Sequence, residues 1–274
     1  MFPNLVHAAI PFFVGSILLE IGISAYIKTK NYHAKDAASS IAMGLGNVFV
    51  GILTKGLIFG VYSMVHRFAL FNLEYQWWVW VLCFFGDDIS YYWYHRKAHT
   101  IRYFWASHVI HHSSRYYNLA TALRQTWTGG ITGSFIFYLW MPLLGFEPLM
   151  ILFMHSVSLL YQFWIHTEVI KKMPRWFEFI FNTPSHHRVH HSSDLKYLDK
   201  NHAGILIIWD RMFGTFEPEI ESVKYGLFNN VNTFNPTKIT FMGWQQIFKD
   251  VRQAKNLNQA MYFFFGPPKT KHEL

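Results

Sequence analysis

The segment WWVWVLCFFGDDISYYWYHRKAH (Trp77–His99) joins a long apolar and aromatic run directly to a pair of histidines. A bilayer-spanning helix needs about 20 apolar residues, and the run from Trp77 to Tyr94 approaches that length. His95 and His99 are four positions apart, so a helix places both imidazoles on one side. We therefore expect a helix that leaves an apolar environment and ends with two side chains able to hold a metal ion.

Two further histidine groups share a tighter spacing, HxxHH. Members of such a group at i, i+3 and i+4 lie on one helical face. His166 adds one more imidazole at the end of an apolar run. Neutral imidazole is the commonest protein ligand for metals, and nine of them exceed what one ion can hold, so we expect two metal ions. The candidate ligands are His95, His99, His108, His111, His112, His166, His187, His190 and His191.

Helical phase also suggests residues that support these ligands. Asp88 lies seven residues before His95, on the same stripe, where its carboxylate could accept the free N–H of a ligating imidazole. Gln162 stands four residues before His166 and could form a hydrogen bond near the metals. His186 precedes the last group directly, outside its spacing.

Composition places these groups in a membrane protein. Hydrophobic residues make up 51% of the 274 residues and charged residues only 15%, against roughly 25% charged in a typical soluble domain. Intrinsic disorder is excluded by this hydrophobicity, and the single Cys83 allows neither a disulfide framework nor a thiolate metal site. We expect an all-α integral membrane protein with four or five hydrophobic segments, at 5–27, 41–65, 77–94, 131–144 and 148–165; the last two could cross fully or form a re-entrant hairpin.

The basic residues indicate an orientation. Of the 24 lysines and arginines, all but Lys55 and Arg67 fall on the side that carries the histidine groups. The positive-inside rule makes that side cytoplasmic, so we expect a cytoplasmic histidine-rich cap. Attraction to anionic lipid headgroups explains the formal charge of +8, and no nucleic-acid partner is expected. We expect three parts: N-terminal transmembrane helices (1–76), a domain that carries the histidine groups (77–218) and a C-terminal tail on the membrane surface (219–274).

Chemistry narrows the possible metals. All-imidazole ligation suits iron, zinc, copper or nickel. A centre beside the lipid fits a substrate that stays in the bilayer, and a redox metal pair could use dioxygen to attack an unactivated C–H bond, which zinc could not. The non-enzyme alternative is a His-rich metal transporter or sensor. A transporter should have ionisable residues that continue through paired spans. The ionisable residues within the spans considered are Glu20 and Lys55, and they are not stacked with the histidines.

The histidine segments and their surroundings resemble a known family. Residues 88–99, DISYYWYHRKAH, followed by HVIHH (108–112), are similar to the membrane-bound fatty acid hydroxylase (sterol desaturase) superfamily. TALRQ (121–125), YQFWIHTE (161–168), NTPSHHRVHH (182–191), DKN (199–201) and IIWDRMFGTF (207–216) resemble its alkylglycerol monooxygenase branch.

This resemblance implies a fatty acid hydroxylase-like helical fold, two iron ions held by the nine histidines, dioxygen as co-substrate and a membrane lipid as substrate. Enzymes of the ether-lipid branch hydroxylate the carbon next to the ether oxygen, and the product breaks into an aldehyde and glycerol. Their reductant is tetrahydrobiopterin, yet the glutamate that usually follows the HxxxH motif is replaced here by Thr100. A separate electron-transfer protein is therefore the alternative donor. Fatty acid hydroxylation and sterol or carotenoid oxidation are the alternative reactions.

Overall fold

The computed structural model describes residues 5–268, and within that range its regular structure is helical. No strand occurs in the described range; the only β-type pairings there are two isolated bridges, Phe181 with Leu206 and Ser192 with Tyr225. The predicted all-α class is confirmed.

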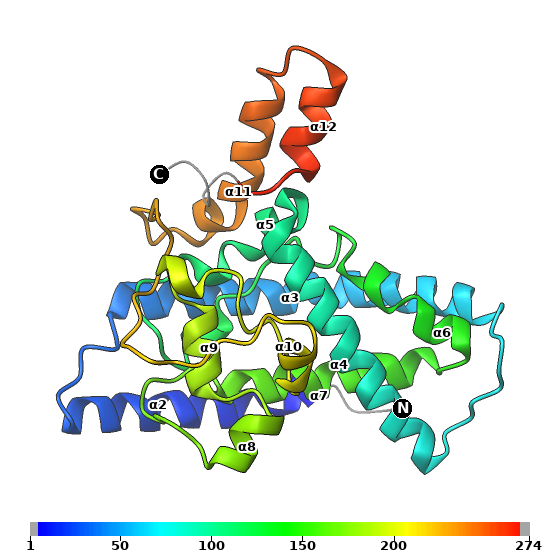
Figure 1. The fold of residues 1–274 in the computed structure, drawn as a ribbon, viewed down its shortest axis with the longest axis horizontal. Helices are drawn as coiled ribbons and strands as arrows, with labels where there is room; N and C mark the ends of the chain where they lie inside the picture. The colour runs from blue at the N-terminus through cyan, green and yellow to red at the C-terminus, as the bar shows by residue number, and fades with distance from the viewer. Residues whose placement is uncertain (1–4, 269–274) are drawn as a thin grey trace.

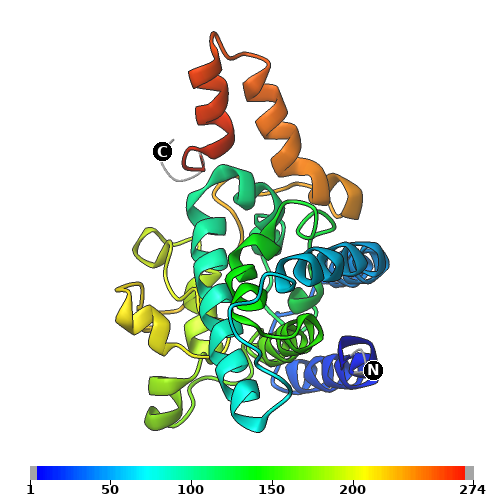
Figure 2. The same ribbon diagram turned by 90° about the vertical axis from the view of Figure 1, so that its right-hand side faces the viewer.

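Three long helices lie side by side and form one layer, which Figure 2 shows nearly end-on. All three are rich in apolar residues; two contain proline only at the first turn, where its missing N–H costs no hydrogen bond, and the third contains none. A short helix precedes them. These elements are α1 (Leu5–Ala8), α2 (Ile10–Tyr26), α3 (Ala34–His66) and α7 (Pro148–Trp164).

A fourth long helix, α4 (Trp77–Thr100), crosses this layer diagonally (Figure 1). Its buried side packs against α7 and the 3-10 turn at Ser134–Tyr138, and Val79 and Cys83 join Tyr62 of α3 and Met150 of α7 in the largest apolar core. The last turn of α4 continues almost at once into α5 (Arg102–His108). The apolar run thus carries the histidines out of the helical layer, as the sequence of this segment predicts.

Short elements fill the space around the end of α4. Between α5 and α7, the 3-10 turns η1 to η3 are followed by a one-turn helix that ends at Gly145, whose φ of 111° favours glycine. A Cβ there would lie 2.0 Å from the Phe71 carbonyl oxygen, so the chain requires glycine at this close approach. The elements are η1 (His111–Ser113), η2 (Thr121–Leu123), η3 (Ser134–Tyr138), α6 (Trp140–Leu144), α8 (Arg175–Ile180), α9 (Pro184–His190), η4 (Leu195–Tyr197) and α10 (Ile208–Met212).

The C-terminal part forms a helical hairpin that stands away from the rest in both views (Figures 1 and 2). It consists of α11 (Pro236–Val251) and α12 (Leu257–Phe265). The middle of α11 lies close to α5, because Gly243 brings it so near that a Cβ would lie 2.7 Å from the Ala106 backbone. Further along, Arg102 of α5 forms a buried ion pair with Asp250.

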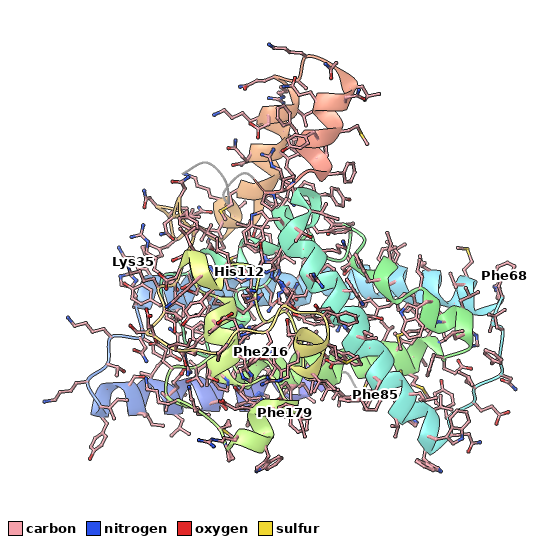
Figure 3. The ribbon with its side chains drawn as sticks, in the orientation of Figure 1. Lys35, Phe68, Phe85, His112, Phe179 and Phe216 are labelled. Atoms are coloured by element: carbon pink, nitrogen blue, oxygen red, sulfur yellow. The ribbon has the colours of Figure 1, made fainter. Side chains whose placement is uncertain are left out.

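The hydrophobic segments form helices, but they differ in length. Among the described residues, α3 alone is long and apolar enough to cross a membrane by itself; the helices at 10–26, 134–144 and 148–164 are apolar and shorter. Many large apolar side chains of α2, α3 and α4 are exposed, among them Phe85 of α4, and so is Phe68 in the loop after α3, at the right-hand edge of Figure 3. These exposed apolar faces agree with a membrane environment.

Candidate metal centre

The nine predicted histidines converge into two adjacent groups at the centre of the molecule, where His112 is labelled in Figure 3. Within each group every histidine offers one ring nitrogen, and these nitrogens lie within 4.8 Å of one another. The first group comprises His95, His99, His108, His112 and His190, and the second comprises His111, His166, His187 and His191. Each HxxHH segment therefore supplies both groups, because its last two histidines point to different sides.

The first group draws on three helices and one turn. The Nε2 atoms of His95 and His108 are 2.9 Å apart, and those of His108 and His112 are 3.1 Å apart. The rings of His99 and His190 close the group, with centroids 4.7 Å apart. Four of the five side chains are buried, and His108 is partly exposed.

The second group has fewer members and a similar spacing. The His166 Nε2 lies 3.1 Å from the Nε2 of His111 and 3.1 Å from that of His187. The Nε2 atoms of His187 and His191 are 3.2 Å apart. His166 follows directly after the end of α7, so this group joins the long helical layer to α9.

Backbone carbonyls hold four of these rings by the nitrogen that faces away from the group. His95 Nδ1 donates to the His202 oxygen at 2.7 Å, and His190 Nδ1 donates to the Lys200 oxygen at 2.9 Å. His166 Nδ1 donates to the Gln162 oxygen at 2.7 Å, and His111 Nδ1 contacts the Arg124 oxygen at 3.3 Å. A carbonyl can only accept, so Nδ1 carries the proton in these rings.

Burial keeps the imidazoles neutral. Desolvation is the main cause that lowers the pKa of His111 to about 4, and it holds the pKa of His108 and His190 well below the ordinary value. A neutral ring with its proton on Nδ1 presents a lone pair at Nε2. The Nε2 lone pairs of His111 and His166 therefore face each other at 3.1 Å, an arrangement that a cation between them would stabilise.

The spacing itself fits a coordinated metal. Imidazole nitrogens bind zinc at about 2.1 Å, and two neighbouring ligands of an octahedral ion at that distance lie about 3 Å apart. The five Nε2–Nε2 separations of 2.9 to 3.2 Å match this edge. His190 Nε2 is buried and has no hydrogen-bond partner among the described residues. The donor set thus suits a metal ion in each group.

The predicted hydrogen-bond partner of Asp88, a ligating imidazole, is wrong. Its carboxylate accepts the backbone N–H groups of Ile205 and Leu206 at 2.8 and 3.0 Å and the Trp209 indole at 2.9 Å, and no imidazole. Helical phase put Asp88 on the same side of the helix as His95. It could not show that residues 205–209 would occupy the carboxylate. Asp88 fixes that turn, which follows closely on His202.

The other two predicted supporting residues also act differently. Gln162 supports His166 through its backbone oxygen, while its side-chain amide donates to Ser158 at 3.0 Å. His186 belongs to neither histidine group. Its ring faces Phe216, and its Nδ1 lies 3.3 Å from the Thr183 hydroxyl.

The loop 199–202 contains supporting residues that the spacing analysis did not assign. Asp199 Oδ1 lies 3.6 Å from His99 Nδ1, and the ring of His202 lies 5.1 Å from that of His99. The backbone takes left-handed conformations at Asp199 (φ 57°) and Asn201 (φ 56°), which turn the loop over the first group. The only sequence signal was DKN (199–201) as one of the family-like motifs.

Glu20 lies within the first apolar segment, and its contacts beside the second histidine group account for a carboxylate at that position. It is buried at 4% exposure and accepts hydrogen bonds from the Tyr32 hydroxyl, the Leu119 backbone at 2.8 Å and the Thr167 hydroxyl. Thr167 directly follows His166. Glu20 therefore ties α2 to the segment that presents His166, and its partners offset the cost of burying it.

Two buried arginines hold the same side of the centre. Arg188 of α9 pairs with Glu219 at 2.7 Å and donates to the carbonyl oxygens of Thr167 and Ile170. Arg124, whose own carbonyl contacts His111, pairs with Asp36 of α3 at 3.2 Å. These charge-assisted contacts are stronger than neutral hydrogen bonds and fix the loops that carry the second group.

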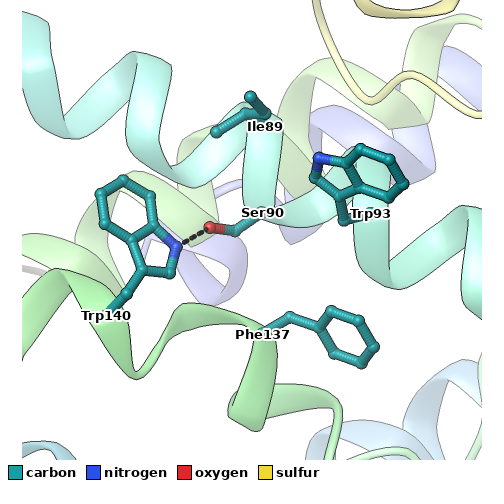
Figure 4. Close-up of a pocket in the computed structure, with 5 residues that line it drawn as sticks. All are labelled: Ile89, Ser90, Trp93, Phe137 and Trp140. Carbon is teal, nitrogen blue, oxygen red and sulfur yellow. Dashed lines mark hydrogen bonds between the residues drawn. The ribbon is translucent and has the colours of Figure 1, made fainter. Parts of the chain in front are cut away.

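An apolar groove of about 490 Å³ runs along α4, lined by Ile89, Ser90, Trp93, Phe137 and Trp140 (Figure 4). The Trp140 indole donates to the Ser90 hydroxyl at 2.9 Å across it. Trp93 lies about 200° around the helix from His95, and no ligand candidate lines the groove. This groove therefore follows the outer face of α4 and does not open onto the histidines.

Taken together, the helical scaffold and the two all-imidazole groups define a protein with a histidine-rich centre of the type found in metal-dependent oxygenases. Comparison with protein families agrees: residues 80–215 match the fatty acid hydroxylase family model, and the chain belongs to that family. No solved structure matches the chain significantly.

Several curated relatives extend the similarity beyond this domain. The chain is 41% identical over 272 residues to an alkylglycerol monooxygenase of Danio rerio, covering 97% of the chain and 60% of the relative. It is 45% identical over 243 residues to the Homo sapiens alkylglycerol monooxygenase, covering 87% of the chain and 54% of the relative. The chain thus spans between half and two thirds of the length of these relatives.

Proposed function

We propose that this chain carries the catalytic centre of a membrane-bound, dioxygen-dependent lipid monooxygenase that holds two iron ions. The observation that carries the proposal is the pair of adjacent, enclosed imidazole groups within a fatty acid hydroxylase domain. The ligands are His95, His99, His108, His112 and His190 for one ion and His111, His166, His187 and His191 for the other. The similarity to alkylglycerol monooxygenases makes an ether lipid the preferred substrate.

The bound iron would supply the redox chemistry that dioxygen use requires, because zinc, which suits the same ligands, has none. The residues of the chain prepare that chemistry in three ways. Burial keeps the imidazoles neutral, so that they can ligate. Carbonyls hold the protons of His95, His111, His166 and His190 on Nδ1 and leave Nε2 for the metal. The burial of most of the rings restricts access of bulk water.

The proposed reaction inserts one oxygen atom into the C–H bond beside the ether oxygen of an alkylglycerol. The other oxygen atom of dioxygen leaves as water, with two electrons from an external donor and two protons from solvent. The hydroxylated product is a hemiacetal, which breaks into a fatty aldehyde and glycerol. Fatty acid hydroxylation and sterol or carotenoid oxidation use the same C–H chemistry and are the competing substrate classes.

The electron donor is a tetrahydrobiopterin or an electron-transfer protein. Thr100 bears on this choice, because it stands where pterin-using relatives of the ether-lipid branch usually carry glutamate. Threonine has no carboxylate to offer a pterin. Its side chain is exposed, and its hydroxyl donates to the Arg96 carbonyl at 3.1 Å.

We further propose a multi-pass membrane arrangement with the histidine groups on the cytoplasmic side and the three parts 1–76, 77–218 and 219–274. The exposed apolar faces of α2, α3 and α4 support it, as does the concentration of basic residues on the histidine side. No nucleic-acid partner enters this proposal.

The test combines metal analysis with a substrate panel. Purified chain in lipid nanodiscs should contain about two irons, and it should consume dioxygen with an alkylglycerol only when a reductant is present. Free fatty acids and sterols, each with and without reduced pterin, form the comparison arms. Reversible zinc binding without turnover on any substrate would instead support a transporter or sensor and would refute the oxygenase.

A further inference from the structure

A second, polar pocket lies on the outer side of α9, away from the metal centre. It has a volume of about 220 Å³ and is bounded by α8, the start of α9, α10 and the segment 216–219. None of the nine ligand candidates lines it. Its wall includes His186, which directly precedes His187 in the chain.

The charges around this pocket leave a positive excess. Lys172, Arg175 and Arg211 all line it. Of its two carboxylates, Glu219 is engaged on both oxygens by Arg188, which lies behind the wall. The pocket therefore attracts an anion.

The remaining carboxylate is occupied by the protein itself. Glu178 Oε1 accepts the Met173 backbone N–H at 2.9 Å and the hydroxyls of Ser185 at 2.8 Å and Thr183 at 3.3 Å. This network fixes one wall of the pocket and partly offsets the charge of Glu178. It does not neutralise the three cations.

The interior of the pocket is rigid and polar. Ser185 and His186 are 1% and 2% exposed. Arg211 donates to the carbonyl oxygens of Glu178 and Phe179, and its guanidinium carbon lies 3.6 Å from the centre of the Phe216 ring. A guanidinium held by stacking and backbone contacts keeps its remaining N–H groups oriented for an acceptor.

The outer rim of the pocket is apolar and exposed. Trp176 and Phe179 of α8 are 65% and 59% exposed, and Figure 3 shows Phe179 at the edge of the molecule with Phe216 further inside. Lys171 and Lys172 precede this helix. Exposed aromatic rings beside lysines and arginines are typical of segments at the headgroup level of a membrane.

We propose that this pocket binds the phosphate of a phospholipid headgroup, with Lys172, Arg175 and Arg211 as its cationic contacts and Trp176 and Phe179 resting among the adjoining lipids. Arginine and lysine are the residues that recognise phosphate in proteins. The bound headgroup would fix α8 and the first turn of α9, the helix that supplies His187, His190 and His191. This proposal concerns a binding site and does not depend on the proposed oxidation.

Native mass spectrometry of the full chain in detergent tests the site without any turnover. Three probes are titrated separately: dioleoyl phosphatidic acid, dioleoylglycerol, which has the same acyl chains and no phosphate, and inorganic phosphate. We expect a one-to-one complex with phosphatidic acid and at least ten-fold weaker retention of dioleoylglycerol. In the variant K172A/R175A the affinity for phosphatidic acid should fall about 30-fold, the effect of two cations near an anionic headgroup.

The variant K249A/R252A provides a matched control, because it removes one lysine and one arginine from exposed positions at the C-terminal end of α11. Its affinity for phosphatidic acid should remain within about two-fold of the unmodified chain. Binding of inorganic phosphate that also depends on Lys172 and Arg175 would support an anion site and identify the free anion as a further ligand. Equal retention of dioleoylglycerol, or equal losses in both double variants, would overturn the proposal. Because iron content and turnover are not measured, these outcomes are independent of those that test the oxygenase.

Discussion

The two halves of the candidate metal centre consist of the same type of side chain but are supported in different ways. The first group has five imidazoles, and its outer contacts come from the loop 199–202, through the carbonyls of Lys200 and His202 and the carboxylate of Asp199. The second has four imidazoles and is surrounded by buried ionic residues, Glu20 and Arg188 among them.

This difference has a physical cause in the route of the chain. The first group forms where α4, α5 and α9 meet, so regular helices place most of its rings. The second depends on η1 and on the segment after α7, which have no regular hydrogen-bond ladder of their own. In these irregular segments, charged side chains form hydrogen bonds with backbone groups and so fix the conformation of the chain. The second half should therefore be the more sensitive to changes far from its ligands.

Removing one ligand from each half should give the largest effect. His108→Ala leaves four imidazoles in the first group, whereas His111→Ala leaves three in the second. We expect both to abolish lipid oxidation, because the proposed reaction needs both ions. Iron per chain should fall to about one in His111→Ala, and His108→Ala should keep part of its second iron.

Metal analysis after gel filtration measures this difference, and circular dichroism checks the helical content. His66→Ala is a suitable control, because His66 lies in neither group and only contacts the Gly145 carbonyl and Glu147 near the far end of α3. Full activity in either ligand variant would remove that residue from the centre. Equal iron loss in both would contradict the asymmetry.

Glu20→Gln should give the next largest effect, and it should act on the second half alone. Glutamine keeps the shape but replaces one accepting oxygen by a donating amide, which then faces either Thr167 or the pair Tyr32 and Leu119. The lost charged hydrogen bond is worth about 1.5–3 kcal/mol. We expect about a ten-fold weaker affinity for the iron at His166, seen as one of two irons released early in a chelator titration.

Glu74→Gln makes the same chemical change at an exposed position in the loop before α4 and should leave both irons unchanged. If Glu20 only stabilised the fold, both irons would leave together as the protein unfolds. Release of one iron before any loss of helical signal separates the positioning role from a purely structural one.

Much of the centre could be predicted from the sequence because ligand spacing within a helix is local information. The i,i+4 pair at His95 and His99 and the two HxxHH segments identified eight of the nine members, and His166 was added from its place at the end of an apolar run. The helical class also followed from local apolar runs.

The supporting residues could not be predicted, because they depend on contacts between distant segments. Asp88 meets backbone groups 117 residues away, and Glu20 meets Thr167 across 147 positions. Neither separation leaves a periodic signal. The division of the histidines between the two groups could not be predicted either, because both HxxHH segments contribute to both groups, the one that ends in η1 as well as the one in α9.

Asp199→Asn should give the smallest effect and should act on the first half. The carboxylate lies 3.6 Å from His99 Nδ1, too far for a strong hydrogen bond, so it acts mainly by its charge. Supporting contacts to a ligating histidine are worth about 10–100-fold in metal affinity, and we expect a change below the lower end of that range, of about three-fold. Competition with a chelator at fixed pH measures this change in affinity. The control is Asp194→Asn, because the Asp194 carboxylate accepts hydrogen bonds from the Ser192 hydroxyl and the Lys224 backbone; its metal affinity should be unchanged. If Asp199→Asn weakened metal affinity more than Glu20→Gln does, the proposed order would be reversed. Support by regular helices would then not explain why the first group tolerates distant changes.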